Sequence, residues 1–119
     1  MATLTPLTDD DVDRMLGLPV AVLYKHSPSC GASRWAMTEV QQLAEDRPGT
    51  PIFVVDVIRQ RPLARQLAQI LDVAHASPQV LVLDHGDVTW HGSHSNVRAA
   101  FVEEQLDLLQ ADEPKARSS

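Results

Sequence analysis

The order of apolar segments along the chain predicts an α/β fold, with a mixed sheet of about four strands and helices on both faces. Short apolar runs at 18–26 and 51–58 are separated by an amphipathic segment, so these two strands should be parallel and joined by a right-handed crossover. Two further predicted strands, at 78–84 and 88–91, are joined by the turn-forming residues 85–87 and should form an antiparallel hairpin.

Length and composition predict a single domain. The chain has 119 residues, close to the commonest domain size, and we expect the domain to cover 1–110, followed by a flexible polar tail at 111–119. The formal charge of -6 and the absence of a Lys/Arg cluster argue against a nucleic-acid partner. Neither a secretory signal nor a bilayer-spanning apolar run is recognisable, so we expect a cytoplasmic protein with no membrane partner.

Apolar residues at helical spacing predict four helices. The first lies within 5–16, where Thr8 is the expected N-cap, and the second covers about 33–46. The third begins at Pro62, a residue that suits the first helical position, and the last covers 97–109. The side chains expected to face the core from the last three helices are Ala36, Val40, Leu43 and Ala44, then Leu63, Leu67, Ile70 and Leu71, then Val97, Phe101 and Leu108.

Cys30, the only cysteine, is the candidate nucleophile. It follows a predicted strand and precedes a predicted helix, where free backbone N–H groups and the helix dipole stabilise a thiolate and lower the thiol pKa from about 8.5 toward neutrality. Ser33 lies one helical turn further on and could donate a hydrogen bond to the sulfur. The C-x-x-S spacing gives one attacking thiol and no resolving thiol.

An inert cysteine is the alternative, because a lone cysteine is commonly a small buried hydrophobe. The flanking segments HSPS and GAS are small and polar, which suits an accessible loop better than a core position. The five histidines and one cysteine do not match a zinc-ligand spacing, so we expect no metal site. His26 could stabilise the thiolate if it were charged, or could simply be a surface residue at a strand end.

The element order resembles that of a thioredoxin-like domain. In such domains a cis-proline stands opposite the active cysteine, and Pro78 is at that place. A cis bond would present the backbone N–H and C=O groups of Ser77 to an extended thiol-bearing ligand. The alternative is a trans proline that begins a strand.

Three stretches resemble the bacillithiol system redox-active protein of the YtxJ type, also called monothiol bacilliredoxin. They are KHSPSCGAS, VVDVIRQRPLARQLAQILDVAHASPQVLVL and VTWHGSHSNV, and the resemblance covers about Leu18 to Phe101. It implies a thioredoxin-like, cytoplasmic oxidoreductase that removes bacillithiol, a low-molecular-weight thiol, from mixed disulfides with client proteins. Bacillithiol would then be the co-substrate, with no tightly bound cofactor.

Several residues near Cys30 become candidate ligand contacts through this resemblance. Gly31 and Ala32 stand where family members commonly have Pro and Ile, and they should lie beside the sulfur. Lys25 could attract the carboxylates of the malate part of bacillithiol, although a solvated lysine is an equal possibility. C-G-x-S also resembles the C-G-F-S of monothiol glutaredoxins, some of which hold an iron–sulfur cluster with an external thiol. The alternatives to the oxidoreductase are therefore an iron–sulfur carrier and a non-catalytic binding module.

Arg61 conflicts with its predicted position. It lies at the start of a helix, where a positive charge is unfavourable for the helix dipole. The conflict points to a ligand, or to an ion-pair partner such as Asp56.

Overall fold

A computed structural model describes residues 4–29 and 31–118 of the chain, with side chains described as far as Gln110. It contains a five-stranded mixed sheet in the order β1-β3-β2-β4-β5. The strands are β1 (Thr5–Pro6), β2 (Val20–His26), β3 (Ile52–Asp56), β4 (Gln79–Asp84) and β5 (Asp87–Ser93).

Strand directions agree with the predicted topology. β3 is parallel to both β1 and β2, whereas β4 is antiparallel to β2 and to β5. The hairpin between β4 and β5 turns at His85 and Gly86, both with positive φ, as a two-residue turn of this hand requires. The fifth strand, β1, was not predicted because two residues are too short to show an alternating pattern. The predicted α/β class is confirmed.

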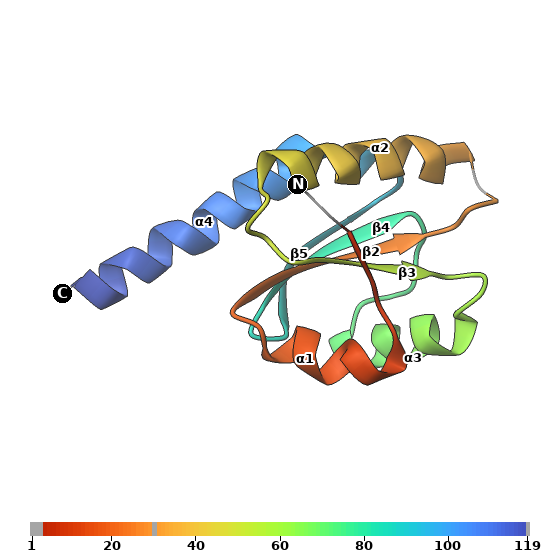
Figure 1. Cartoon of the computed structure of the whole chain (residues 1–119), viewed down its shortest axis with the longest axis horizontal. Coiled ribbons are helices and arrows are strands. Elements are labelled where there is room, and N and C mark those ends of the chain that lie inside the picture. Colours follow the sequence, from red (N-terminus) through yellow and green to blue (C-terminus); the bar gives the residue numbers. More distant parts are fainter. Residues whose placement is uncertain (1–3, 30, 119) are drawn as a thin grey trace.

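Two pairs of helices cover the two faces of the sheet (Figure 1). Helices α1 (Val12–Gly17) and α3 (Arg61–Leu71) lie on one face, and α2 (Gly31–Asp46) and α4 (Ala99–Ser118) lie on the other. Short 3-10 turns, Asp9–Asp11 and His94–Asn96, precede α1 and α4. None of the helices that the structure describes is long and apolar enough to cross a membrane.

The alternation of side chains along β2 divides the core into two clusters. Ala21 and Leu23 pack with residues of α1 and α3, whereas Val22 and Tyr24 pack with residues of α2 and α4. All four are fully buried, as expected for a central strand with helices on both faces. Burial of a large apolar side chain contributes roughly 1.5–3 kcal/mol, so these clusters fix the position of β2 and of the loop that follows it.

Three side chains that were predicted to face the core lie at the surface. Ile70, Phe101 and Leu108 are 53%, 42% and 56% exposed. Helix α4 begins at Ala99 rather than Val97, and its buried stripe runs through Ala99, Val102 and Leu106. In α3 the buried face includes Ala64 instead of Ile70, because a narrow stripe of four residues is enough to cover this face of the sheet.

The ends of two helices also differ from the prediction. Thr8 does not cap a helix through its side chain; its Oγ1 donates to Asp11 Oδ2 at 3.2 Å, and residues 9–11 form a 3-10 turn first. Helix α4 continues to Ser118, beyond the predicted end at 109, and extends past the edge of the sheet (Figure 1). The domain boundary at 110 and a flexible tail at 111–119 remain predictions.

Candidate active site

The candidate site lies between the end of β2 and the start of α2. β2 ends at His26, a short loop follows, and α2 begins at Gly31. Cys30 lies outside the described residues, so its exposure and lowered pKa stay predictions. Gly31 and Ala32 are exposed in the first turn of α2, and a Cβ on Gly31 would meet nothing within 4 Å. The predicted sequence of strand, loop and helix around the cysteine is confirmed.

Ser33 fixes the first turn of α2 to this loop. Its side chain is fully buried, and its Oγ accepts a hydrogen bond from the backbone N–H of Ser27 at 3.3 Å. Its hydroxyl hydrogen makes no hydrogen bond to any of the described residues. A hydroxyl group both accepts and donates, so this hydrogen can still serve a neighbouring group.

Tyr24 and His26 form a second connection to the same turn. The hydroxyl of buried Tyr24 donates to the carbonyl oxygen of Ser33 at 3.2 Å and lies 3.0 Å from Nδ1 of His26. Which of these two groups donates in the contact depends on the tautomer of His26. Burial lowers the pKa of His26 even though the charge of Asp56 opposes that shift, so the imidazole is mainly neutral at pH 7. This neutral state argues against His26 as a cation that stabilises a thiolate.

The segment Ser77–Pro78 lies beside the end of β2. Its peptide bond is cis, as predicted. The register pairs Lys25 with Gln79, which places Ser77 and Pro78 next to the start of the loop that contains Cys30. Ser77 is half-buried and Pro78 is buried. The proposed pairing of the Ser77 backbone with a ligand is not tested by these observations.

Lys25 is a buried residue and not the solvated surface lysine that was the alternative. Its exposed fraction is 1%, and burial lowers the pKa of its ammonium group to about 8. The Nζ atom lies 3.5 Å from Nδ1 of His75, in the segment between α3 and β4. Gln79, which pairs with Lys25 from the neighbouring strand β4, is also buried. Its Oε1 atom has no hydrogen-bond partner among the residues that the structure describes.

Arg61 does not pair with Asp56. The Asp56 carboxylate accepts hydrogen bonds from the backbone N–H groups of Ile58 and Arg59 and lies 3.9 Å from the Arg59 guanidinium. Within the described part of the chain, Arg61 forms no ion pair. The predicted conflict at the start of α3 is therefore not resolved by a neighbouring carboxylate.

His75 and Arg65 were missed as site residues. Both line a pocket with Arg61 at the start of α3, and His75 also contacts Lys25. His75 lies within the stretch VVDVIRQRPLARQLAQILDVAHASPQVLVL that resembles the monothiol bacilliredoxins, and this resemblance was the available signal. Arg65 follows Arg61 by four residues and so lies on the same side of α3, a spacing that the sequence alone could have indicated.

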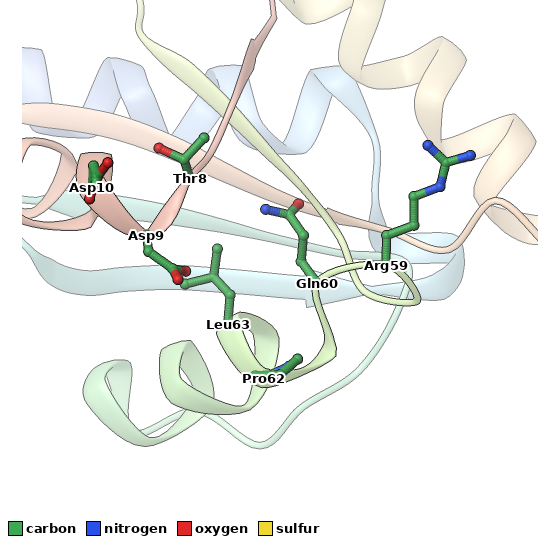
Figure 2. A pocket seen from close by; sticks show the side chains of 7 residues that line it. All are labelled: Thr8, Asp9, Asp10, Arg59, Gln60, Pro62 and Leu63. Atoms are coloured by element: carbon green, nitrogen blue, oxygen red, sulfur yellow. The ribbon is translucent and has the colours of Figure 1, made fainter.

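A larger pocket lies elsewhere on the α1 and α3 side of the sheet (Figure 2). Its volume is about 510 Å³, and it contains none of the candidate site residues; its lining is Thr8, Asp9, Asp10, Arg59, Gln60, Pro62 and Leu63. No group of three His, Asp or Glu side chains positioned to hold a metal ion occurs among residues 4–29 and 31–110.

Solved structures show the class of the protein. A protein described by its thioredoxin fold is 20% identical, with a TM-score of 0.79 over 85% of this chain and 91% of that chain. Thioredoxin from Trypanosoma brucei brucei is 12% identical, with a TM-score of 0.75 over 92% of this chain and 93% of that chain. The chain therefore has a thioredoxin fold.

The family follows from the sequence match. Residues 8–102 match the family described as Monothiol bacilliredoxin BrxC. The chain belongs to the monothiol bacilliredoxin family. Membership of this family and the thioredoxin fold together support a thiol redox role.

Proposed function

We propose that this protein is a monothiol oxidoreductase that removes bacillithiol from mixed disulfides with client proteins. Cys30 is the nucleophile, and its thiolate is stabilised by the N–H groups at the start of α2 and by the hydroxyl of Ser33. One observation about Ser33 carries the proposal. Its side chain is buried, and its Oγ accepts a hydrogen bond from the backbone N–H of Ser27, across the loop that contains the single cysteine. Its hydroxyl hydrogen can still be donated to the thiolate.

The proposed reaction is a pair of thiol–disulfide exchanges. The Cys30 thiolate attacks the bacillithiol sulfur of the mixed disulfide, the old S–S bond breaks, and the client leaves as a thiolate that takes a proton from solvent. Cys30 then carries bacillithiol as a new mixed disulfide. A second low-molecular-weight thiol attacks the bacillithiol sulfur, which releases Cys30 as the thiolate and a symmetric or mixed small disulfide as the product. No electrons are gained or lost overall on the protein.

The other residues have supporting roles in this proposal. The exposed Gly31 and Ala32 leave room at the sulfur for a disulfide substrate. The backbone of Ser77, beside Pro78, pairs with the extended part of the ligand. Lys25 supplies positive potential for the carboxylates of bacillithiol. The proposed setting is a reducing cytoplasm, because the chain has a single cysteine and cannot form an internal disulfide.

The test compares Cys30→Ser with the wild type on a purified, bacillithiolated client protein. The wild type should release the client thiol and carry a bacillithiol adduct that intact mass spectrometry detects. Cys30→Ser should remain folded, form no adduct and release no client thiol. Ser29→Ala, at an exposed neighbouring position, is the matched control and should behave as the wild type. Full activity in Cys30→Ser would end the proposal.

A further inference from the structure

A basic pocket lies at the start of α3, on the side of the sheet where Lys25 is buried. Its volume is about 280 Å³, and it is lined by Val57, Ile58, Arg61, Ala64, Arg65 and His75. Three of these side chains are basic and none is acidic. The pocket therefore offers two guanidinium groups and an imidazole to an anion.

The arginines lack acidic partners. Neither Arg61 nor Arg65 forms an ion pair with any residue that the structure describes, and the neighbouring Asp56 interacts with Arg59. Arg61 and Arg65 are four residues apart on α3, so their side chains can reach the same ligand. A guanidinium group binds a carboxylate through two parallel hydrogen bonds, which makes arginine well suited to carboxylate recognition.

Lys25 supplies an independent sign that an anion belongs here. Its ammonium group is almost completely buried, and its only hydrogen-bond partner among the described residues is the imidazole nitrogen of His75, at 3.5 Å. A buried ammonium group normally has a carboxylate partner. The positive charges of Lys25 and Arg65 contribute, after burial, to lowering the pKa of His75. An anion in the pocket would offset this accumulation of positive charge.

The pocket is attached to the candidate active site. The backbone N–H of Val57, in the pocket wall, donates to the carbonyl oxygen of His26 at 2.9 Å. His26 is the last residue of β2 and precedes Cys30 by four positions. The pocket and the loop that contains Cys30 therefore lie at the same end of the sheet.

We propose that this pocket binds the carboxylates of the small thiol, with Arg61 and Arg65 as direct contacts and Lys25 acting through His75. This inference rests on the proposed function, because the ligand is the thiol that Cys30 would receive. The carboxylates could instead come from acidic side chains of the client, and the experiment separates these sources.

The experiment uses one peptide disulfide in two forms. In one form the peptide is joined to bacillithiol; in the other, both malate carboxylates are methyl esters, which removes their charge and leaves the disulfide intact. We expect the wild type to prefer the charged form through a lower KM, by about tenfold or more, as charge-assisted hydrogen bonds of this kind provide. Arg61→Gln and Arg65→Gln should each reduce this preference, and the double variant should abolish it.

Arg59→Gln is the matched control. Arg59 precedes Arg61 by two residues, is exposed, and lines the other pocket (Figure 2). This variant should retain the preference for the charged form. A preference that persists in the Arg61/Arg65 double variant would overturn the proposal.

Two further outcomes distinguish failure of the proposed carboxylate subsite from failure of the proposed reaction. Equal turnover of the two disulfide forms by the wild type would overturn the carboxylate subsite and leave the proposed function intact. If neither form reacts, both proposals fail.

To distinguish the sources of the carboxylates, the peptide is varied between Glu-rich and Gln-rich forms. An arginine effect that follows the peptide charge and not the malate charge would also overturn the subsite.

Discussion

The side-chain oxygen of Ser33 accepts a hydrogen bond from the backbone N–H of Ser27 at 3.3 Å. The bond joins the segment after β2 to the first turn of α2, across the residues that include Cys30. Both residues are buried, so water cannot easily replace the lost partner if either group is removed. This contact gives Ser33 a structural role and leaves its hydroxyl hydrogen available for a second, chemical role.

Ser33→Ala tests the two roles together. The substitution leaves the buried N–H of Ser27 without its partner, and we expect the free energy of unfolding to fall by about 1–3 kcal/mol. The thiol pKa should also rise, because a donor to the thiolate is lost. Urea unfolding measures the first effect, and the rate of alkylation as a function of pH measures the second. An unchanged alkylation profile would restrict Ser33 to the structural role.

Ser33→Cys should change the outcome of the reaction. Positions 30 and 33 are one helical turn apart, the spacing of a C-x-x-C motif, so the new thiol can attack the Cys30–bacillithiol disulfide. Bacillithiol would leave and an internal disulfide would form. Intact mass spectrometry after reaction with a bacillithiolated client should show a variant that is two hydrogens lighter than its reduced form and carries no bacillithiol adduct. Persistence of the adduct would argue against a Cys30 sulfur within reach of position 33.

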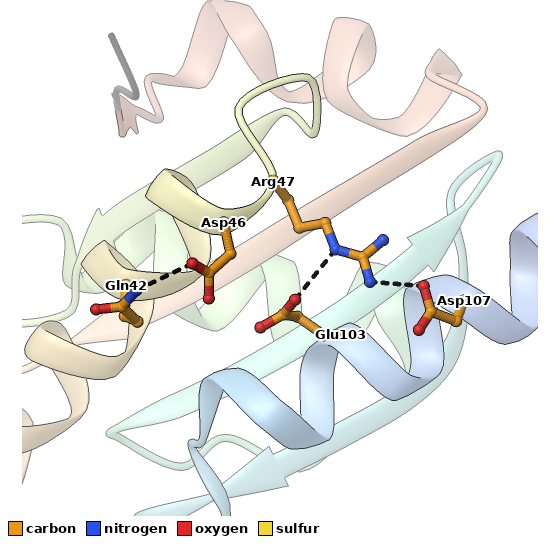
Figure 3. Close-up of polar contacts among 5 residues, drawn as sticks. All are labelled: Gln42, Asp46, Arg47, Glu103 and Asp107. Atoms are coloured by element: carbon orange, nitrogen blue, oxygen red, sulfur yellow. Dashed lines mark hydrogen bonds and ion pairs between the residues drawn. The ribbon is translucent and has the colours of Figure 1, made fainter.

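Arg47 holds the far end of α2 to α4 (Figure 3). Its Nε lies 3.2 Å from Glu103 Oε1, its Nη2 lies 2.6 Å from Asp107 Oδ1, and hydrogen bonding to Asp107 is the main cause that raises the Arg47 pKa. Because these groups are only partly buried, we expect Arg47→Gln to lower the free energy of unfolding by roughly 1 kcal/mol, and by less at high salt. Urea unfolding at two salt concentrations checks this, with Arg34→Gln as the exposed control. Equal effects of the two substitutions would contradict the assigned contact.

Strands β2, β3 and β4 were predictable because they carry apolar runs between clear turn signals, whereas the two-residue strand β1 was not. The hairpin at His85 and Gly86 and the parallel pair β2 and β3 follow directly from such runs. The outer helix faces were less predictable. Phe101 has the right spacing for the core, yet it lies on the surface with the Arg98 guanidinium 5.8 Å from its ring centre. Hydrophobic character alone does not decide burial when a helix covers only part of a face.

The candidate site was predictable only in part. The position of Cys30 between a strand and a helix and the cis bond before Pro78 follow from local sequence order and family resemblance. The contact between Lys25 and His75 joins residues 50 positions apart, and it depends on the register of β2 against β4. A lysine at a strand end is commonly solvated, so its burial could not be read from its neighbours in the sequence.

The burial of Lys25 makes the stability of the protein depend on pH in a defined direction. Its pKa falls from 10.5 to about 8 on folding, so between these values the unfolded state binds more protons than the folded state. The free energy of unfolding should therefore rise as the pH increases from about 8 to 10.5. Below pH 8 the full cost of burying the charged ammonium group, about 3 kcal/mol, is present. His75 is the described side chain that contacts the ammonium group, and the charge of Arg65 lies on the same side.

Lys25→Met should remove this penalty. We expect the free energy of unfolding at pH 7 to increase by about 1–3 kcal/mol, because an apolar side chain of similar length replaces a buried charge. The difference between variant and wild type should shrink as the pH rises toward 10. Both proteins carry Cys30→Ser in these urea titrations, so that thiol ionisation does not contribute. A variant that is less stable at pH 7 would show that the ammonium group is already compensated in the folded protein. With Cys30 restored, the same substitution should raise the KM for the charged disulfide form, because it removes the positive charge that contacts His75 in the wall of the proposed carboxylate pocket.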